Sequence, residues 1–135
     1  MNQNVTIHAI RLQPGQDLKS AIQEFVTDNG MEAGWILSCV GSLTQYNLRF
    51  ANQVSGQEGK GFFEIISLNG TVSVQGCHLH IALSEPNGSL TGGHLLNGCT
   101  IYTTAEIIIA ESHELIFTRE IDGSTNWKEL QIRKK

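Results

Sequence analysis

A hairpin is predicted most clearly by residues 77–94, which read Cys77-His78-Leu79-His80-Ile81-Ala82-Leu83-Ser84-Glu85-Pro86-Asn87-Gly88-Ser89-Leu90-Thr91-Gly92-Gly93-His94. The dipeptide after Pro86 is a strong turn signal. Side chains of a strand alternate between two faces, so His78 and His80 share one face. A hairpin centred on Asn87 places His94 directly opposite His80, with Cβ atoms about 4.5–5.5 Å apart. The three imidazoles are therefore predicted to share one face, and a slip of one residue would separate them.

Three neutral imidazoles with an open fourth position suit a divalent metal, first zinc and then iron or nickel. Gly92 and Gly93 bring no side chains to shield such a site, and they permit a bulge or a close backbone approach. Cys77 is expected on the opposite face and is left out as a ligand. The other interpretation is that two of the histidines are partly buried, hydrogen-bonded side chains and the third is unrelated to them. A bound metal could be catalytic, structural or acquired during purification. His8 and His113 stand alone and are interpreted as ordinary polar residues.

Composition bounds the kind of protein. The 135 residues are 40% apolar, which fits one folded domain over residues 1–135. No apolar run reaches the ~18 residues of a membrane span, and the N-terminus lacks a secretion signal. Three cysteines are an odd number, typical of reduced thiols in the cytoplasm. The net charge of −4 has the wrong sign for gripping DNA, and only 16% charged residues favours self-association.

Periodicity predicts one helix followed by strands. Residues 5–12 have strand composition, Asp17 is a candidate N-cap, and apolar residues at helical spacing run from Leu18 to a stop at Gly30. Asn69-Gly70 is predicted to form a tight turn. We therefore expect an α+β fold with a mostly antiparallel sheet of about eight strands and one main helix near the N-terminus. The further candidate strands are residues 35–40, 43–50, 62–68, 71–76, 78–84, 101–110, 114–119 and 127–132.

Five segments occur in the order typical of one known family: Gly41-Ser42-Leu43, residues 61–70, residues 78–84, Gly92-Gly93-His94-Leu95 and Thr104-Ala105-Glu106. They resemble the PPC (plant and prokaryote conserved) domain, also called the PD1-like DNA-binding protein family. This resemblance implies an α+β domain that assembles as a homotrimer and a metal site at His78, His80 and His94. Plant members add AT-hook segments that bind AT-rich DNA. This chain has no Arg-Gly-Arg-Pro hook, and Phe62 stands where the plant motif has Arg.

The first functional hypothesis is a homotrimeric, DNA-associated or regulatory PPC protein with a metal site, whose other partners are DNA or proteins. The one basic cluster of the chain is Arg133-Lys134-Lys135, and such a terminal cluster is ordinarily a solvated tail. The metal, or the histidines alone, could instead tighten a trimer interface.

The alternative is a small metalloenzyme that uses the same histidines. His78-x-His80-x4-Glu85-x6-Gly92 fits part of a cupin motif, although Gly70 lies too far upstream to complete it. Outside the cupin pattern, Glu64 and Glu106 are candidate acids or bases. Arg11 and Glu106 are the candidates for supporting the metal ligands or binding a ligand. Catalysis is the less favoured of the two hypotheses.

Overall fold

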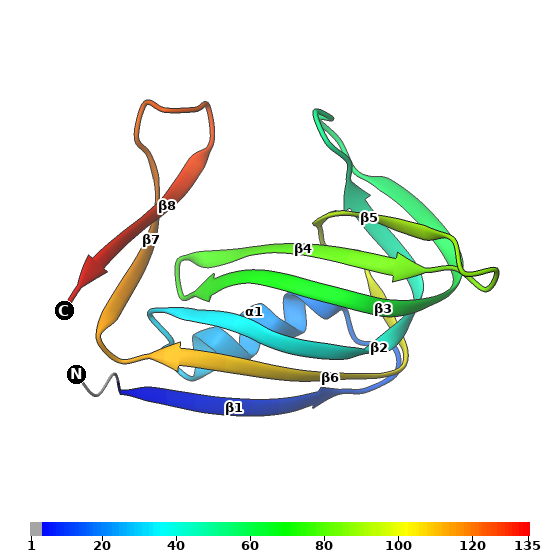
Figure 1. Cartoon of the computed structure of the whole chain (residues 1–135), viewed down its shortest axis with the longest axis horizontal. Coiled ribbons are helices and arrows are strands. Elements are labelled where there is room, and N and C mark those ends of the chain that lie inside the picture. The colour runs from blue at the N-terminus through cyan, green and yellow to red at the C-terminus, as the bar shows by residue number, and fades with distance from the viewer. Residues whose placement is uncertain (1–3) are drawn as a thin grey trace.

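The computed structural model describes residues 4–135, which form one helix and eight strands (Figure 1). Their order along the chain is β1 (Val5–Leu12), α1 (Leu18–Asp28), β2 (Gly34–Arg49), β3 (Gln57–Ser73), β4 (Gly76–Ser84), β5 (Leu90–Leu95), β6 (Thr100–Ser112), β7 (Leu115–Ile121) and β8 (Lys128–Lys134). The α+β fold class is therefore confirmed. Among the described residues, no helix is long and apolar enough to cross a membrane.

Six strands form one antiparallel sheet in the order β1-β6-β2-β3-β4-β5, and β7 and β8 form a separate antiparallel hairpin. The strand β2 is 16 residues long and pairs with β6 and β3 along most of its length. Its last residues also pair with β5, through Leu48 opposite Leu95 and Arg49 opposite His94. The sheet therefore curls back on itself, and β5 lies between β4 and the end of β2.

The helix α1 forms where the sequence predicts it. The Asp17 carboxylate accepts a hydrogen bond from the backbone N–H of Ser20 at 2.9 Å, as an N-cap does. Leu18, Ile22 and Val26 are fully buried, so one stripe of α1 packs onto the sheet. Gly30 follows the helix with a φ of 60°, the left-handed conformation that ends many helices.

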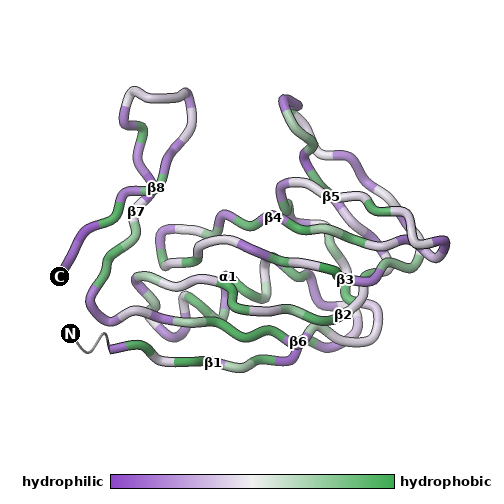
Figure 2. Tube along the Cα trace, in the orientation of Figure 1, coloured by the Kyte–Doolittle hydropathy of each residue, from purple (hydrophilic) through white to green (hydrophobic). Residues whose placement is uncertain are grey.

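The core lies between α1 and the sheet face that it covers, and it is lined by alternate residues of the strands. The opposite face of β1, β6, β2 and β3 is also rich in apolar residues (Figure 2 shows the apolar strands). Val40 is 63% exposed and Phe62 57% exposed, and Ile7, Leu37 and Ile66 of the same strands are also exposed. Phe62 packs against Tyr102 with ring centroids 5.0 Å apart. The β7–β8 hairpin contacts this face near the end of β3, where Arg119 donates a hydrogen bond to Oγ1 of Thr71.

The predicted turn at Asn69-Gly70 is wrong. Both residues lie inside the continuous strand β3, and the turn to β4 is at residues 74–75. Gly70 has a φ of 140°, and a Cβ atom there would lie 1.9 Å from the carbonyl oxygen of His78. The glycine therefore permits a close approach of two strands, which the sequence alone does not distinguish from a turn. In the same way, the two strands predicted around Gly41 are one strand, β2.

Candidate metal centre

The three histidines of the β4–β5 hairpin are brought together. His80 is the cross-strand partner of His94, as predicted from the turn at Asn87. The ring centroids of His78, His80 and His94 lie 5.1, 5.1 and 5.7 Å apart. One ring nitrogen from each lies within 4.8 Å of the other two, and no further Cys, Asp or Glu of residues 4–135 joins this group. The predicted register is confirmed; metal binding stays a prediction that the geometry permits.

The glycine pair before His94 allows this geometry. A Cβ atom on Gly92 would lie 2.5 Å from the carbonyl oxygen of Ile81, and one on Gly93 would lie 2.8 Å from that of Arg49. The β5 backbone is therefore held closely between β4 on one side and β2 on the other. His94 is opposite His80 on β4 and opposite Arg49 on β2, so Arg49 is a direct cross-strand neighbour of the histidine site.

The electrostatic environment disfavours protonation of two of these imidazoles, those of His78 and His94. Burial, with a further contribution from the positive charge of Arg49, lowers the pKa of His94 to about 4. Burial also lowers the pKa of His78, and Arg119 and His80 act in the same direction. A metal binds the unprotonated ring nitrogen, so a group that stays neutral at physiological pH is ready to bind one.

An unpaired buried atom tests whether a metal fits. Nδ1 of His94 is buried and has no hydrogen-bond partner within residues 4–135. Leaving a buried polar atom unpaired costs about 1–3 kcal/mol. A coordinate bond would satisfy this atom, and three imidazoles are a donor set that zinc prefers. The side chains present therefore fit a zinc ion.

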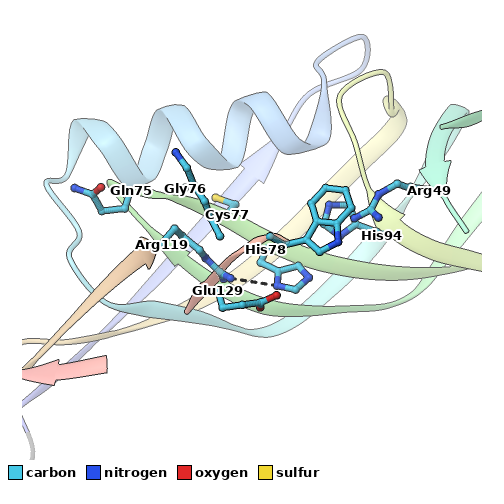
Figure 3. A pocket seen from close by; sticks show the side chains of 10 residues that line it. Arg49, Gln75, Gly76, Cys77, His78, His94, Arg119 and Glu129 are labelled. Atoms are coloured by element: carbon cyan, nitrogen blue, oxygen red, sulfur yellow. Dashed lines mark hydrogen bonds between the residues drawn. The ribbon is translucent and has the colours of Figure 1, made fainter. Parts of the chain in front are cut away.

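A cavity of about 480 Å³ adjoins the histidines, and its other wall is the β7–β8 hairpin (Figure 3). Arg119 of β7 donates to Oγ1 of Thr71 at 2.7 Å and contacts Nδ1 of His78 at 3.4 Å. Arg49 lies over the ring of Trp127, with its guanidinium carbon 4.8 Å from the ring centroid. Sequence reasoning missed Arg49, Arg119 and Trp127, because no local pattern shows where a hairpin docks.

The contact between Arg119 and His78 competes with metal binding. A guanidinium is only a donor, so Nδ1 of His78 must accept and the neutral ring then carries its proton on Nε2. Neither nitrogen is free for a metal while that contact persists. At 3.4 Å the hydrogen bond is long and weak, and Arg119 keeps its shorter bond to Thr71.

The supporting residues predicted from the sequence lie elsewhere. Arg11 and Glu106 are cross-strand partners of each other on β1 and β6, and Arg11 donates to Thr104 at 3.0 Å. The strands β2 and β3 separate β6 from the histidine strand β4. Glu64 is exposed on β3, and Glu85 lies in the β4–β5 turn, outside the histidine group. The structure therefore brings together the three histidines but not these four residues with them.

The remaining histidines and the cysteines have structural partners. His8 hydrogen bonds to Glu111 at 2.8 Å, and His113 hydrogen bonds to Thr6 at 2.7 Å. Burial raises the pKa of Cys39 to about 12 and those of Cys77 and Cys99 to about 11, so these free thiols stay protonated. Cys77 donates to Gln23 of α1 at 2.9 Å and is not part of the histidine group, although it lines the same cavity.

The protein is a curled antiparallel sheet covered by one helix, and it carries a histidine triad on its β4–β5 hairpin. Residues 1–113 match the Plants and Prokaryotes Conserved (PCC) domain, the family called PPC above. The chain belongs to this family, and the predicted resemblance is confirmed. The match ends before the β7–β8 hairpin begins at Leu115.

Individual relatives cover nearly the whole chain. The bifunctional protein GlmU of Synechococcus sp. (strain JA-3-3Ab) is 43% identical over 97% of this chain, which spans 21% of that relative's length. A hypothetical protein of Salmonella enterica is 41% identical, with a TM-score of 0.96 over 100% of this chain and 98% of that one. A metal-containing protein of Archaeoglobus fulgidus is 25% identical, with a TM-score of 0.81 over 96% of each chain. The β7–β8 hairpin thus lies outside the family match but inside these alignments.

Proposed function

We propose that this PPC domain is a metal-binding protein in which His78, His80 and His94 hold a zinc ion. The observation that carries the proposal is the convergence of one nitrogen from each ring within 4.8 Å. The unpaired Nδ1 of His94 and the description of the Archaeoglobus relative as metal-containing support it. Iron and nickel also accept imidazole ligands, and the relative affinities decide among them.

Three protein ligands leave a coordination position open, which distinguishes such a site from a closed structural one. A zinc ion at such a position supplies Lewis acidity. The chain's own residues would shape what binds beside it. Arg49 and Arg119 supply positive charge at the edge of the cavity, and Glu129 supplies a carboxylate. These residues would orient a ligand, and the same arrangement is what the metalloenzyme alternative requires.

Metal analysis of protein purified without an affinity tag tests the proposal. We expect about one zinc per chain in the native protein and almost none in the His80→Ala variant. His113→Ala is the matched control, because His113 lies outside the histidine group and should leave the zinc content unchanged. Equal zinc content in the native protein and in His80→Ala would overturn the proposal, as would metal far below one per chain.

We also propose that the chain assembles as a homotrimer through the outer face of β1, β6, β2 and β3. Support comes from the exposed apolar side chains there, among them Val40, Phe62 and Ile66. Contiguous exposed apolar surface usually marks an interaction site. The number three comes from the family resemblance, because apolar exposure alone gives no subunit count.

Light scattering coupled to gel filtration tests the assembly. We expect a mass three times the 14.8 kDa of one chain. Val40→Glu should reduce the mass to that of one chain, because a charge cannot be buried unpaired in the interface. Ile132→Glu is the control, since Ile132 is 61% exposed on β8 and lies off that face. A single-chain mass for the native protein would contradict the proposal.

Association with DNA, and with it a regulatory role in the cytoplasm, stays a prediction. The basic C-terminal cluster is partly neutralised, because Arg133 lies 3.2 Å from Glu120 and Lys135 lies 3.1 Å from Glu32. Duplex binding that weakens steeply with added salt would support the association, and no binding at low salt would contradict it.

A further inference from the structure

The cavity beside the histidines has an excess of positive charge. Arg49, Arg119 and Lys128 line it, and Glu129 is the single carboxylate among its lining residues. Glu129 is itself engaged, because its Oε1 accepts a hydrogen bond from Thr125 at 2.6 Å.

Two arginines at this cavity lack an anionic partner. No ion pair formed within residues 4–135 involves Arg49 or Arg119. Arg119 is partly buried, and Glu129 acts on its charge from farther than an ion-pair distance. A partly buried guanidinium without a directly paired carboxylate is a costly arrangement that an incoming anion would relieve.

The cavity lining also offers an apolar surface, the ring of Trp127, to the uncharged part of a ligand. Trp127 is 57% exposed and presents its ring to Arg49 at the cavity. The loop that carries Trp127 is ordered by local bonds: Oγ1 of Thr125 accepts from the backbone N–H of Trp127 at 3.1 Å. A tryptophan side chain has only two rotatable bonds, so it offers contact area with little loss of conformational entropy.

We propose that this cavity binds a small organic carboxylate, whose charge is held by Arg49 and Arg119 and whose apolar part packs against Trp127. A cavity of about 480 Å³ lies within the range of small-molecule sites. The planar guanidinium fork matches a carboxylate with two parallel hydrogen bonds. The lining residues lie on strands and turns, so the helix N-terminus that commonly binds phosphate is missing from this cavity.

The inference goes beyond the proposed function and does not depend on it. If zinc is bound by the histidines, its charge adds to that of the arginines and strengthens the preference for an anion. Without zinc, the arginines and Trp127 still form the site. The two proposals can therefore fail separately, and both metal-free and zinc-loaded protein belong in the test.

Nitrogen-15 NMR titration with benzoate is the experiment. We expect benzoate to shift the indole signal of Trp127 saturably, while that of Trp35 stays unchanged. Benzamide, the neutral analogue, should bind at least about tenfold more weakly, because a charged hydrogen bond is lost. Inorganic phosphate should compete only weakly.

Variants assign the binding to the cavity. Arg119→Gln should weaken benzoate binding about tenfold, and Arg49→Gln provides a second test should the first variant unfold. Arg133→Gln is the matched control, because Arg133 is on the same hairpin but outside the cavity, and it should change the affinity less than about twofold.

Three results would overturn the inference: equal binding of benzoate and benzamide, tighter binding of phosphate than of benzoate, or unchanged affinity in both folded arginine variants. Benzoate binding to a protein that takes up no zinc would refute the metal proposal and leave this one standing. Zinc uptake without any benzoate-induced shift would refute the carboxylate site and leave the metal proposal standing.

Discussion

The β4–β5 strands and the β7–β8 hairpin form opposite walls of one cavity, and they are held by different means. The histidines lie on strands of a six-stranded sheet, where backbone register fixes their positions. The hairpin is a separate two-stranded sheet, docked through a few contacts such as that of Phe117 N–H to the Glu32 carbonyl at 2.9 Å. The metal ligands and Arg49 are therefore built into the sheet, whereas Arg119 and Trp127, the other groups that would contact an organic ligand, can vary with the hairpin.

The largest effect on stability is expected at the close approach of β3 to β4 beside His78. Gly70→Ala should lower the free energy of unfolding by about 3 kcal/mol or more, because a Cβ atom would meet the His78 carbonyl oxygen at 1.9 Å. Gly123→Ala, at the hairpin tip, is the matched control. Gly123 also has a positive φ, of 87°, but nothing lies within 4 Å of its Cβ position, so only about 1 kcal/mol is expected. Urea denaturation at one protein concentration measures both variants. Equal losses of stability in the two would contradict the close approach of β3 to β4 at Gly70.

The second effect concerns the anchor of the hairpin. Phe117 is 7% exposed and joins the hairpin to the rest of the molecule. Phe117→Ala should cost about 3 kcal/mol through the cavity it leaves. Ile121→Ala, on the same strand at 61% exposure, should cost less than about 0.5 kcal/mol. Equal unfolding midpoints for Phe117→Ala and the native protein would show that the hairpin is not anchored there.

In the third prediction, one substitution changes the affinities for zinc and for benzoate in opposite directions. Arg119→Gln should raise zinc affinity a few-fold, about 2–5, because it removes a weak hydrogen bond to Nδ1 of His78 and a nearby positive charge. The same substitution should weaken benzoate binding. Competition with a chelating dye measures the zinc affinity of the native and variant proteins. A large loss of zinc affinity would mean that the hairpin helps to hold the metal.

The smallest effect expected is at the hairpin's outer edge. The ion pair of Arg133 and Glu120 spans 3.2 Å between side chains that are 63% and 47% exposed. Arg133→Gln should change the free energy of unfolding by less than about 1 kcal/mol, because solvent screens such a pair. Thermal melting at low and high salt measures this, and a larger loss would show that the edge carries more of the hairpin's stability than its exposure indicates.

Much of the sheet wall could be predicted from the sequence. Asp17 and Gly30 mark the ends of α1, and the turn at Asn87 fixes the pairing of His80 with His94. These are local signals, since each depends on residues close together in the chain. The Asn69-Gly70 signal failed because a glycine is equally suited to a turn and to a close approach between strands.

The contacts of Arg49 and of the hairpin wall could not be predicted, because they join residues far apart in the sequence. Arg49 reaches His94 only because β2 is long enough to meet β5. Arg119 reaches Thr71 and His78 only because the hairpin docks against β3 and β4. For Arg11 and Glu106, strand composition showed that they lie in strands but not which sheet neighbours separate them from the histidines.

X-ray absorption at the zinc edge of the zinc-loaded protein tests most directly whether the histidine triad holds the ion. The account predicts a first shell that contains three imidazole nitrogens at about 2.0–2.1 Å, with the outer-shell scattering typical of imidazole rings. A sulfur ligand at about 2.3 Å, or a shell with fewer than three imidazoles, would contradict it.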